Sequence, residues 1–82
     1  MAEIIRIEEG LVRKLLEGLN DVNVKREEVL HVFDSQEHIV SLSPDGKYAE
    51  FNEDFRDPTS HGSGLRPLLD YLKREGYQTN LK

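Results

Sequence analysis

The stretch that decides the fold is HIVSLSPDGKYAEF, residues 38–51. Two runs rich in β-branched and aromatic residues flank a central SPDGK, and such runs favour strands joined by a tight turn. Pro44 suits the second position of a type I turn, and Gly46 suits the left-handed residue that closes a three-residue hairpin loop. The sequence therefore predicts antiparallel strands over residues 38–43 and 47–52.

A third strand is expected just upstream, over residues 29–34. The segment VLHVF is rich in β-branched and aromatic side chains, and DSQE after it supplies turn residues, with the turn centred on Ser35–Gln36. The apolar residues of this segment would also share one helix face, with Asn23 as a possible N-cap. A strand is the preferred interpretation, and a helix within residues 24–34 is the alternative.

Helical periodicity flanks this meander on both sides. Residues 3–19 carry apolar side chains at a 3.6-residue period, and residues 65–75 place four leucines on one face. Pro67 fits the first turn of the second helix, where its missing N–H costs least. Gly76 fits the left-handed position just after that helix, with Tyr77 folding back in a Schellman motif. Residues 78–82 are expected to form a frayed tail.

The predicted order is helix, three strands, helix, and it defines the fold class. We expect an α+β domain with a two-layer α-β-β-β-α architecture, a three-stranded antiparallel meander and N- and C-terminal helices, all within residues 1–82. The chain has 82 residues and no cysteine, so its core is small and no disulfide or thiolate metal site supports it. Charges interrupt the opening MAEIIRIEEG, which is typical of neither a signal peptide nor a membrane span, and we expect a cytoplasmic protein.

Charge is distributed unevenly along the chain. The net charge is −5, and residues 27–62 hold nine acidic and two basic side chains. Phosphate backbones are bound by stripes of Lys and Arg, so this segment makes nucleic acid an unlikely partner. We expect residues 50–57 to steer the protein toward basic protein surfaces, although acidic residues also simply keep small domains in solution.

The alternation of side chains predicts which residues face which side of the sheet. Closing the second hairpin at Ser43 and Lys47 places Leu42 opposite Tyr48 and Val40 opposite Glu50. The expected core face consists of Leu30, Val32, Ile39, Ala49 and Phe51, with Ser41. The expected opposite face carries Val29, His31, Phe33, His38, Val40, Leu42, Tyr48 and Glu50. If both helices cover the core face, the opposite face is an exposed apolar patch.

That patch is the predicted protein-binding site. Its proposed contact residues are Phe33, His38, Val40, Leu42 and Tyr48. Aromatic residues inside a polar rim are typical of interfaces, so either a homodimer or a heterologous protein partner is expected. The alternative is that the helices lie on opposite faces of the sheet and leave no open face.

The loop FNEDFRDPTSHGSGLRP, residues 51–67, suggests a second kind of site. Its glycines precede a helix whose first N–H groups lack partners, which is how anion sites are built. The candidate anion-binding residues are Ser60, His61, Ser63 and Arg66. The glycine spacing matches neither the P-loop nor the dinucleotide-binding pattern, so a plain connector is the preferred interpretation.

Other chemistry has little support in the sequence. His31 and His38 are expected to approach each other across the first hairpin, but Asp34 and Glu37 lie at the turn tip, and a metal site needs three or four converging ligands. The acidic residues from Glu50 onward lack the alternation of a calcium loop. No nucleophile motif is present. We therefore predict no catalytic residue, no metal, no cofactor and no enzymatic activity.

The predicted helix–three strands–helix order resembles the topology of double-stranded RNA-binding domains. Those domains place a lysine cluster at the start of the last helix, where this chain reads GLRPLLDYLK with Arg66 alone. The sequence therefore favours a small acidic regulatory module of adaptor or inhibitor type that binds protein. A phosphate- or nucleic-acid-binding domain that uses the helix start at Gly62–Arg66 is the alternative.

Overall fold

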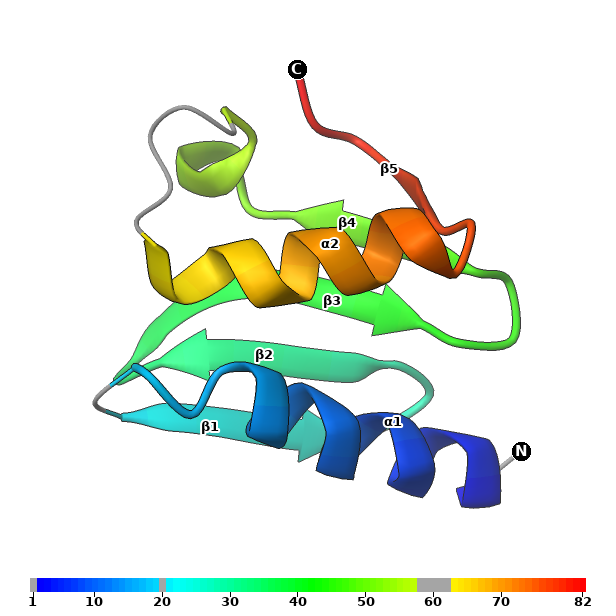
Figure 1. The fold of residues 1–82 in the computed structure, drawn as a ribbon. Helices are drawn as coiled ribbons and strands as arrows, with labels where there is room; N and C mark the ends of the chain where they lie inside the picture. The colour runs from blue at the N-terminus through cyan, green and yellow to red at the C-terminus, as the bar shows by residue number, and fades with distance from the viewer. Residues whose placement is uncertain (1, 20, 58–62) are drawn as a thin grey trace.

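A five-stranded sheet forms one layer of the molecule and two helices form the other (Figure 1). The computed structural model describes residues 2–19, 21–57 and 63–82. The elements in chain order are α1 (Ala2–Leu15), β1 (Val22–Arg26), β2 (Leu30–Asp34), β3 (Glu37–Ser43), β4 (Tyr48–Phe51), a 3₁₀ turn (Glu53–Phe55), a second 3₁₀ turn (Ser63–Leu65), α2 (Arg66–Arg74) and β5 (Gln78–Thr79). The α+β class is confirmed, and the sheet is larger than predicted.

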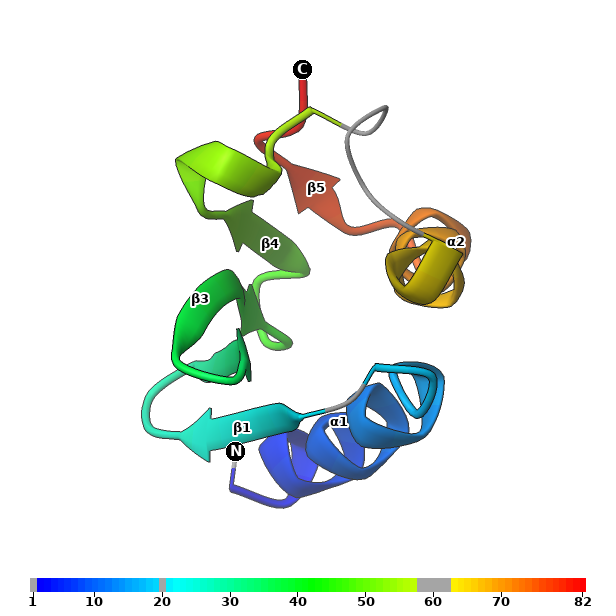
Figure 2. The ribbon, with the colours of Figure 1, turned by 90° about the vertical axis from the view of Figure 1, so that its left-hand side faces the viewer.

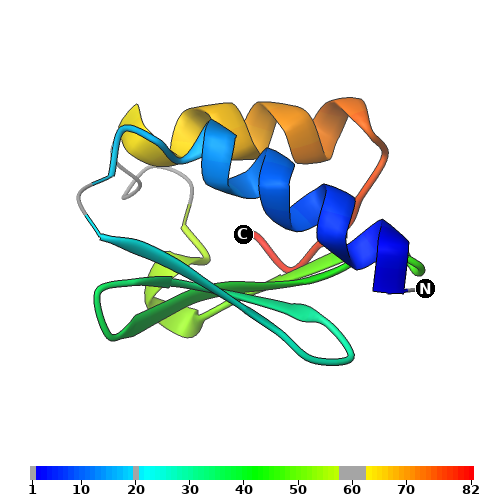
Figure 3. The same ribbon diagram turned by 90° about the horizontal axis from the view of Figure 1, so that it is seen from below.

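The strands lie side by side in the order in which they occur in the chain. The pairs from β1 to β4 are antiparallel, and β5 adds to β4 in parallel. Both helices pack on the same face of this sheet, as two perpendicular views show (Figures 2 and 3). Within the described residues, neither α-helix covers the other face.

Strand β1 corrects the prediction for the segment after the first helix. That helix ends at Leu15 rather than residue 19, and Val22–Arg26 forms an edge strand paired with β2. The alternation of Val22, Asn23, Val24 and Lys25 was the available signal for it. With this added strand, the topology no longer matches the helix–three strands–helix order of double-stranded RNA-binding domains.

Strand β5 corrects the prediction of a frayed tail. The Gln78 N–H donates to the Lys47 carbonyl at 2.7 Å. Beyond the strand, the Asn80 side chain bonds both backbone groups of Phe51: its Oδ1 accepts from the N–H at 2.7 Å and its Nδ2 donates to the carbonyl at 3.0 Å. The Asn80 side-chain amide therefore continues the pairing with β4 beyond β5 and holds the C-terminal segment against the sheet.

The first hairpin has the predicted turn but an unpredicted bulge. Phe33 pairs with His38, as expected, and the turn residue Ser35 has a φ of 58°. The next pair is Val32 with Val40, so Ile39 is the extra residue of a β-bulge. The bulge allows the adjacent side chains of Ile39 and Val40 both to be buried.

The second hairpin is closed one residue later than predicted. Ser43 pairs with Tyr48 and Leu42 with Ala49, so the loop has four residues. The residue with left-handed φ is Lys47, at 51°, and not Gly46. Together with the bulge, this register turns Val40 and Leu42 toward the helices and Ser41 away from them.

The core lies between the sheet and the two helices. Leu30, Val32 and Leu42 are fully buried beneath Val12 and Leu68. The other core residues are Leu16, Ile39, Val40, Ala49, Phe51, Leu65, Tyr71, Leu72 and Tyr77. All five residues of the predicted apolar core face belong to this set.

The end of α2 forms the predicted Schellman motif. Gly76 has a φ of 79°, and the N–H of Tyr77 donates to the Leu72 carbonyl at 2.9 Å.

We expect Gly76→Ala to lower the free energy of unfolding by about 1 kcal/mol, because a Cβ is disfavoured at this φ. Urea denaturation measures the change. Glu75→Ala, at the right-handed position before it, is the control and should have a smaller effect; equal effects of the two changes would contradict this account of the helix end.

Candidate functional site

The helix-free face of the sheet carries a polar and aromatic surface. Because side chains alternate along each strand, the neighbours of the buried residues point away from the helices. One row crosses four strands as Lys25, His31, Ser41 and Glu50. Phe33 and His38 form the adjacent row, and Tyr48 lies opposite Ser43. We call His31, Phe33, His38, Ser41, Tyr48 and Glu50 the open-face cluster.

A serine hydroxyl joins the two histidines of this cluster. Ser41 Oγ lies 3.0 Å from His31 Nδ1 and 2.9 Å from His38 Nε2. A hydroxyl has a single proton, so at least one of the two rings must donate its N–H to the oxygen. The ring of Phe33 lies against His38 with a centroid separation of 5.3 Å. These contacts hold the rings in fixed positions on an otherwise open surface.

The surroundings of His38 lower the pKa of its imidazole. Desolvation is the larger cause that lowers the pKa of His38, and the neighbouring His31 lowers it further. The carboxylate of Glu50 and a backbone hydrogen bond act in the opposite direction. Protonation of this imidazole therefore opposes its native position.

The rim of the open face is mainly acidic. Glu27 Oε2 lies 3.4 Å from His31 Nε2, and the same side chain pairs with Lys25 at 3.2 Å. A hydrogen bond from Lys25 is the largest cause that lowers the pKa of Glu27. Glu50 adds a second carboxylate, and the 3₁₀ turn that follows β4 begins with Glu53 and Asp54. The surface thus presents aromatic rings and imidazoles beside negative charge.

Glu27, His31 and Ser41 follow one another in the order of a catalytic triad, but the geometry does not favour catalysis. Strand β3 is paired on both sides, so the backbone N–H groups beside Ser41 are engaged in the sheet and none is directed at a substrate oxygen. His38 Nε2 also forms a hydrogen bond with the same Ser41 hydroxyl.

The structure places three of the five predicted protein-binding residues on the open face, with Phe33 and His38 paired near one end of β3 and Tyr48 opposite Ser43 at the other. Phe33 and His38 are half-buried on the open face, and Tyr48 is 38% exposed there. The other two, Val40 and Leu42, are wrong as surface residues because both are fully buried against the helices. Ser41, which the predicted register assigned to the core, replaces them at the centre of the cluster.

The predicted anion site has a different structural role where it is described. Ser60 and His61 lie outside the described residues. Ser63 belongs to a 3₁₀ turn, and Arg66 is exposed at the start of α2. A Cβ on Gly64 would lie 2.4 Å from Leu19 Cδ2, so this glycine allows the turn to pack against the segment after α1. That contact supports the connector interpretation.

Within residues 2–19, 21–57 and 63–82, no three His, Asp or Glu side chains are grouped so as to hold a metal ion. None of the helices in the described part of the chain is long and apolar enough to cross a membrane.

Comparison with known proteins adds no family. No family model matches the chain, and neither the curated proteins nor the solved structures include a match.

Proposed function

We propose that this protein is a non-enzymatic protein-interaction module that docks a partner on the helix-free face of its sheet. One observation carries the proposal: both helices cover the same face of the sheet (Figure 2), and the uncovered face holds a positioned group of aromatic and imidazole rings. Rings with few rotatable bonds lose little conformational entropy on binding and are enriched at interfaces.

Charge favours a heterologous partner over a second copy. The chain carries a net charge of −5, and Glu27 and Glu50 lie at the margin of the open face. Two such surfaces would repel each other, whereas a basic surface with apolar side chains would complement both the carboxylates and the rings. The proposed partner is therefore a basic protein, which would be consistent with an adaptor or inhibitor role.

Replacing Phe33 and Tyr48 together by Ser is expected to abolish partner binding and to preserve the fold. Central aromatic residues of an interface often contribute about 2 kcal/mol each, so affinity should fall at least tenfold. The matched control is Ile4→Ser with Ile7→Ser, because these α1 side chains are 43% and 68% exposed and lie on the other layer.

The experiment captures partners from an extract of the native host and repeats the binding with each purified partner. Support requires that binding is lost in the Phe33 and Tyr48 variant, retained in the control variant and weakened by salt. Equal loss in both variants would overturn the proposal. Light scattering that shows a wild-type dimer and a monomeric Phe33 and Tyr48 variant would assign the face to self-association instead.

A further inference from the structure

A second surface lies at the free edge of the sheet, beside α1. Strand β1 is the first strand in the sheet order, so only one of its sides is paired. A groove of about 510 Å³ runs between this strand and the N-terminal half of α1. Its lining residues are Ile5, Arg6, Glu9, Val24, Lys25, Arg26 and Glu27.

The hydrogen bonds at the two ends of β1 reveal which of its backbone groups do not pair with β2. The Ser35 N–H donates to the Asp21 carbonyl at 2.7 Å, and the Glu27 N–H donates to the Val29 carbonyl at 3.0 Å. The register between these bonds is continuous. Because hydrogen-bonded and non-bonded pairs alternate in antiparallel strands, Val24 and its second neighbours Val22 and Arg26 direct their N–H and C=O groups outward.

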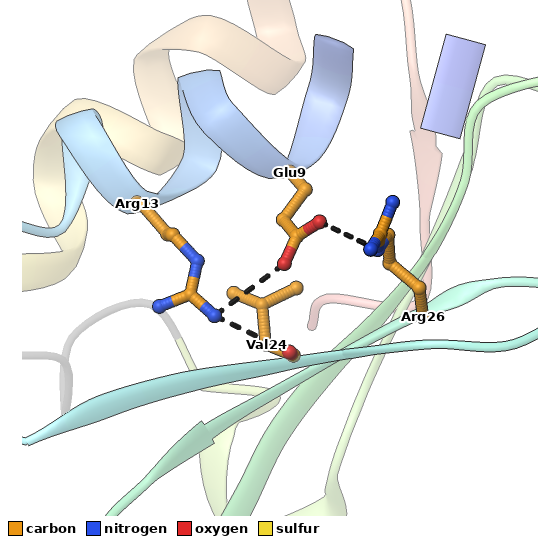
Figure 4. A network of polar contacts seen from close by, with 4 residues as sticks. All are labelled: Glu9, Arg13, Val24 and Arg26. Carbon is orange, nitrogen blue, oxygen red and sulfur yellow. Dashed lines mark hydrogen bonds and ion pairs between the residues drawn. The ribbon is translucent and has the colours of Figure 1, made fainter. Parts of the chain in front are cut away.

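A network of charged side chains covers part of this edge (Figure 4). Arg13 Nη2 lies 3.5 Å from the Val24 carbonyl, a weak contact that confirms the outward direction of that group. The carboxylate of Glu9 lies between two arginines, 3.4 Å from Arg13 and 2.8 Å from Arg26. An internal carboxylate therefore already occupies the cationic side of the groove.

The groove retains a positive charge that this network does not neutralise. Arg6 lines the groove and forms no ion pair with any other described residue. Two copies of the edge would bring the Lys25 and Arg26 side chains of both chains to one seam, which opposes a dimer through β1. An incoming strand that carries carboxylates would meet Arg6 and Arg26 with complementary charge.

We propose that the β1 edge and the adjoining α1 groove bind an extended, acidic peptide segment as an added strand. The peptide backbone would pair with the outward groups of Val24 and Arg26, and Ile5 and Val24 would form the apolar floor of the groove. Its carboxylate would compete with Glu9 for the arginines. This surface adjoins the open face, because Lys25 and Glu27 line the groove and also lie at the margin of that face, and it takes a ligand of opposite charge.

The test uses short synthetic peptides and amide exchange of the intact chain. The probe is a capped peptide of alternating Glu and Thr, compared with a capped peptide of alternating Gln and Thr. Binding of the acidic peptide should slow exchange at the amides of Val24 and Arg26, which point outward, more than at Lys25, which is already bonded to β2. A Gln and Thr peptide with a free C-terminal carboxylate tests whether a terminal carboxylate can replace the Glu side chains in binding.

Backbone pairing and charge recognition are separated by modified peptides and by variants. Alternate N–H groups of the bound peptide point toward β1, and the others point away from it. N-methylation of the first set of alternate residues should therefore abolish binding, and N-methylation of the other set should leave it intact. Arg6→Gln should weaken binding about three- to fivefold and Glu9→Gln should strengthen it by a similar factor. Arg74→Gln, exposed in α2, is the charge-matched control and should change nothing.

Several results would overturn the proposal. These are the absence of any change in β1 at saturating acidic peptide, equal binding of the capped Gln peptide, and tolerance of N-methylation in both frames. Equal effects of Arg6→Gln and Arg74→Gln would reduce the interaction to the net charge of the chain. Thermal unfolding of each variant confirms that the fold is intact, since all three substitutions lie outside the buried core.

Discussion

The Leu42→Asp variant is expected to be unfolded in buffer at room temperature. Leu42 is fully buried between Leu30 and Ala49 and lies beneath the helices. An aspartate there would lose the burial of a leucine, about 2 kcal/mol, and add the cost of an unpaired buried carboxylate. A total loss of at least about 4 kcal/mol matches the whole stability that the core of so small a domain supplies, about 3–5 kcal/mol.

The matched control is Ser43→Asp, one residue further along the same strand. Ser43 is half-buried and faces away from the helices, so the free energy of unfolding should change by about 0.5 kcal/mol or less. Circular dichroism and urea denaturation of both variants measure the difference. If Leu42→Asp is as stable as Ser43→Asp, Leu42 lies on the open face, which would contradict its burial against the helices.

The register of this hairpin shows why the sequence alone was insufficient. Local turn chemistry favours Gly46 in the left-handed conformation, whereas the structure places Lys47 there. A non-glycine residue in that region costs about 1 kcal/mol. Burial of Leu42 contributes about 2 kcal/mol, so the core outweighs the turn. That comparison requires knowledge of which face the helices cover, which short-range patterns do not contain.

The bulge at Ile39 had a signal that allowed two interpretations. Ile39 and Val40 are adjacent apolar residues, and an unbroken strand would send one of them to each face. A bulge puts both in the core and reverses the faces of the residues that follow in β3, which is why Ser41 and not Leu42 lies beside the histidines. The helices, the three predicted strands and the end of α2 followed from local patterns, because those patterns agreed with the tertiary packing.

The open-face cluster could be predicted only where local residues determine the turn. Phe33 and His38 flank the first turn, whose position was fixed by local residues, and both lie on the predicted face. The β1 edge was not predictable as a site, because its strand was missed and its cations come from two distant segments. Arg6 and Arg26 meet in one groove only after α1 packs against β1.

A second large effect is expected at the buried contact between the helices. The Tyr71 hydroxyl donates to Glu8 Oε2 at 2.5 Å, and the two residues are 5% and 9% exposed. Tyr71→Phe would leave the buried carboxylate without this donor, and we expect the free energy of unfolding at pH 7 to fall by about 2–3 kcal/mol. Urea denaturation measures it. Combining it with Glu8→Leu should recover much of the loss, because both polar groups are then removed.

Tyr77→Phe is the matched control, and it is not expected to lower the free energy of unfolding. The Tyr77 hydroxyl is buried and makes no hydrogen bond to any described residue, so its removal should be neutral or slightly stabilising. Its ring centroid lies 6.1 Å from that of Tyr71, so the two changes probe the same region. A larger loss for Tyr77→Phe than for Tyr71→Phe would contradict the assigned hydrogen bond.

The same contact predicts how stability depends on alkaline pH. Burial, followed by the hydrogen bond and charge of Glu8, raises the pKa of Tyr71 above its ordinary value of 10, and burial is the first cause that raises the pKa of Tyr77 to about 12. The unfolded chain therefore loses these protons first, so the stabilisation is complete below pH 10 and is lost as pH rises from 10 through 12. Each tyrosine steepens the fall by up to about 1.4 kcal/mol per pH unit. Tyr71→Phe should flatten the curve, and unchanged slopes between pH 10 and 12 would show that the Tyr71 proton is not held by Glu8.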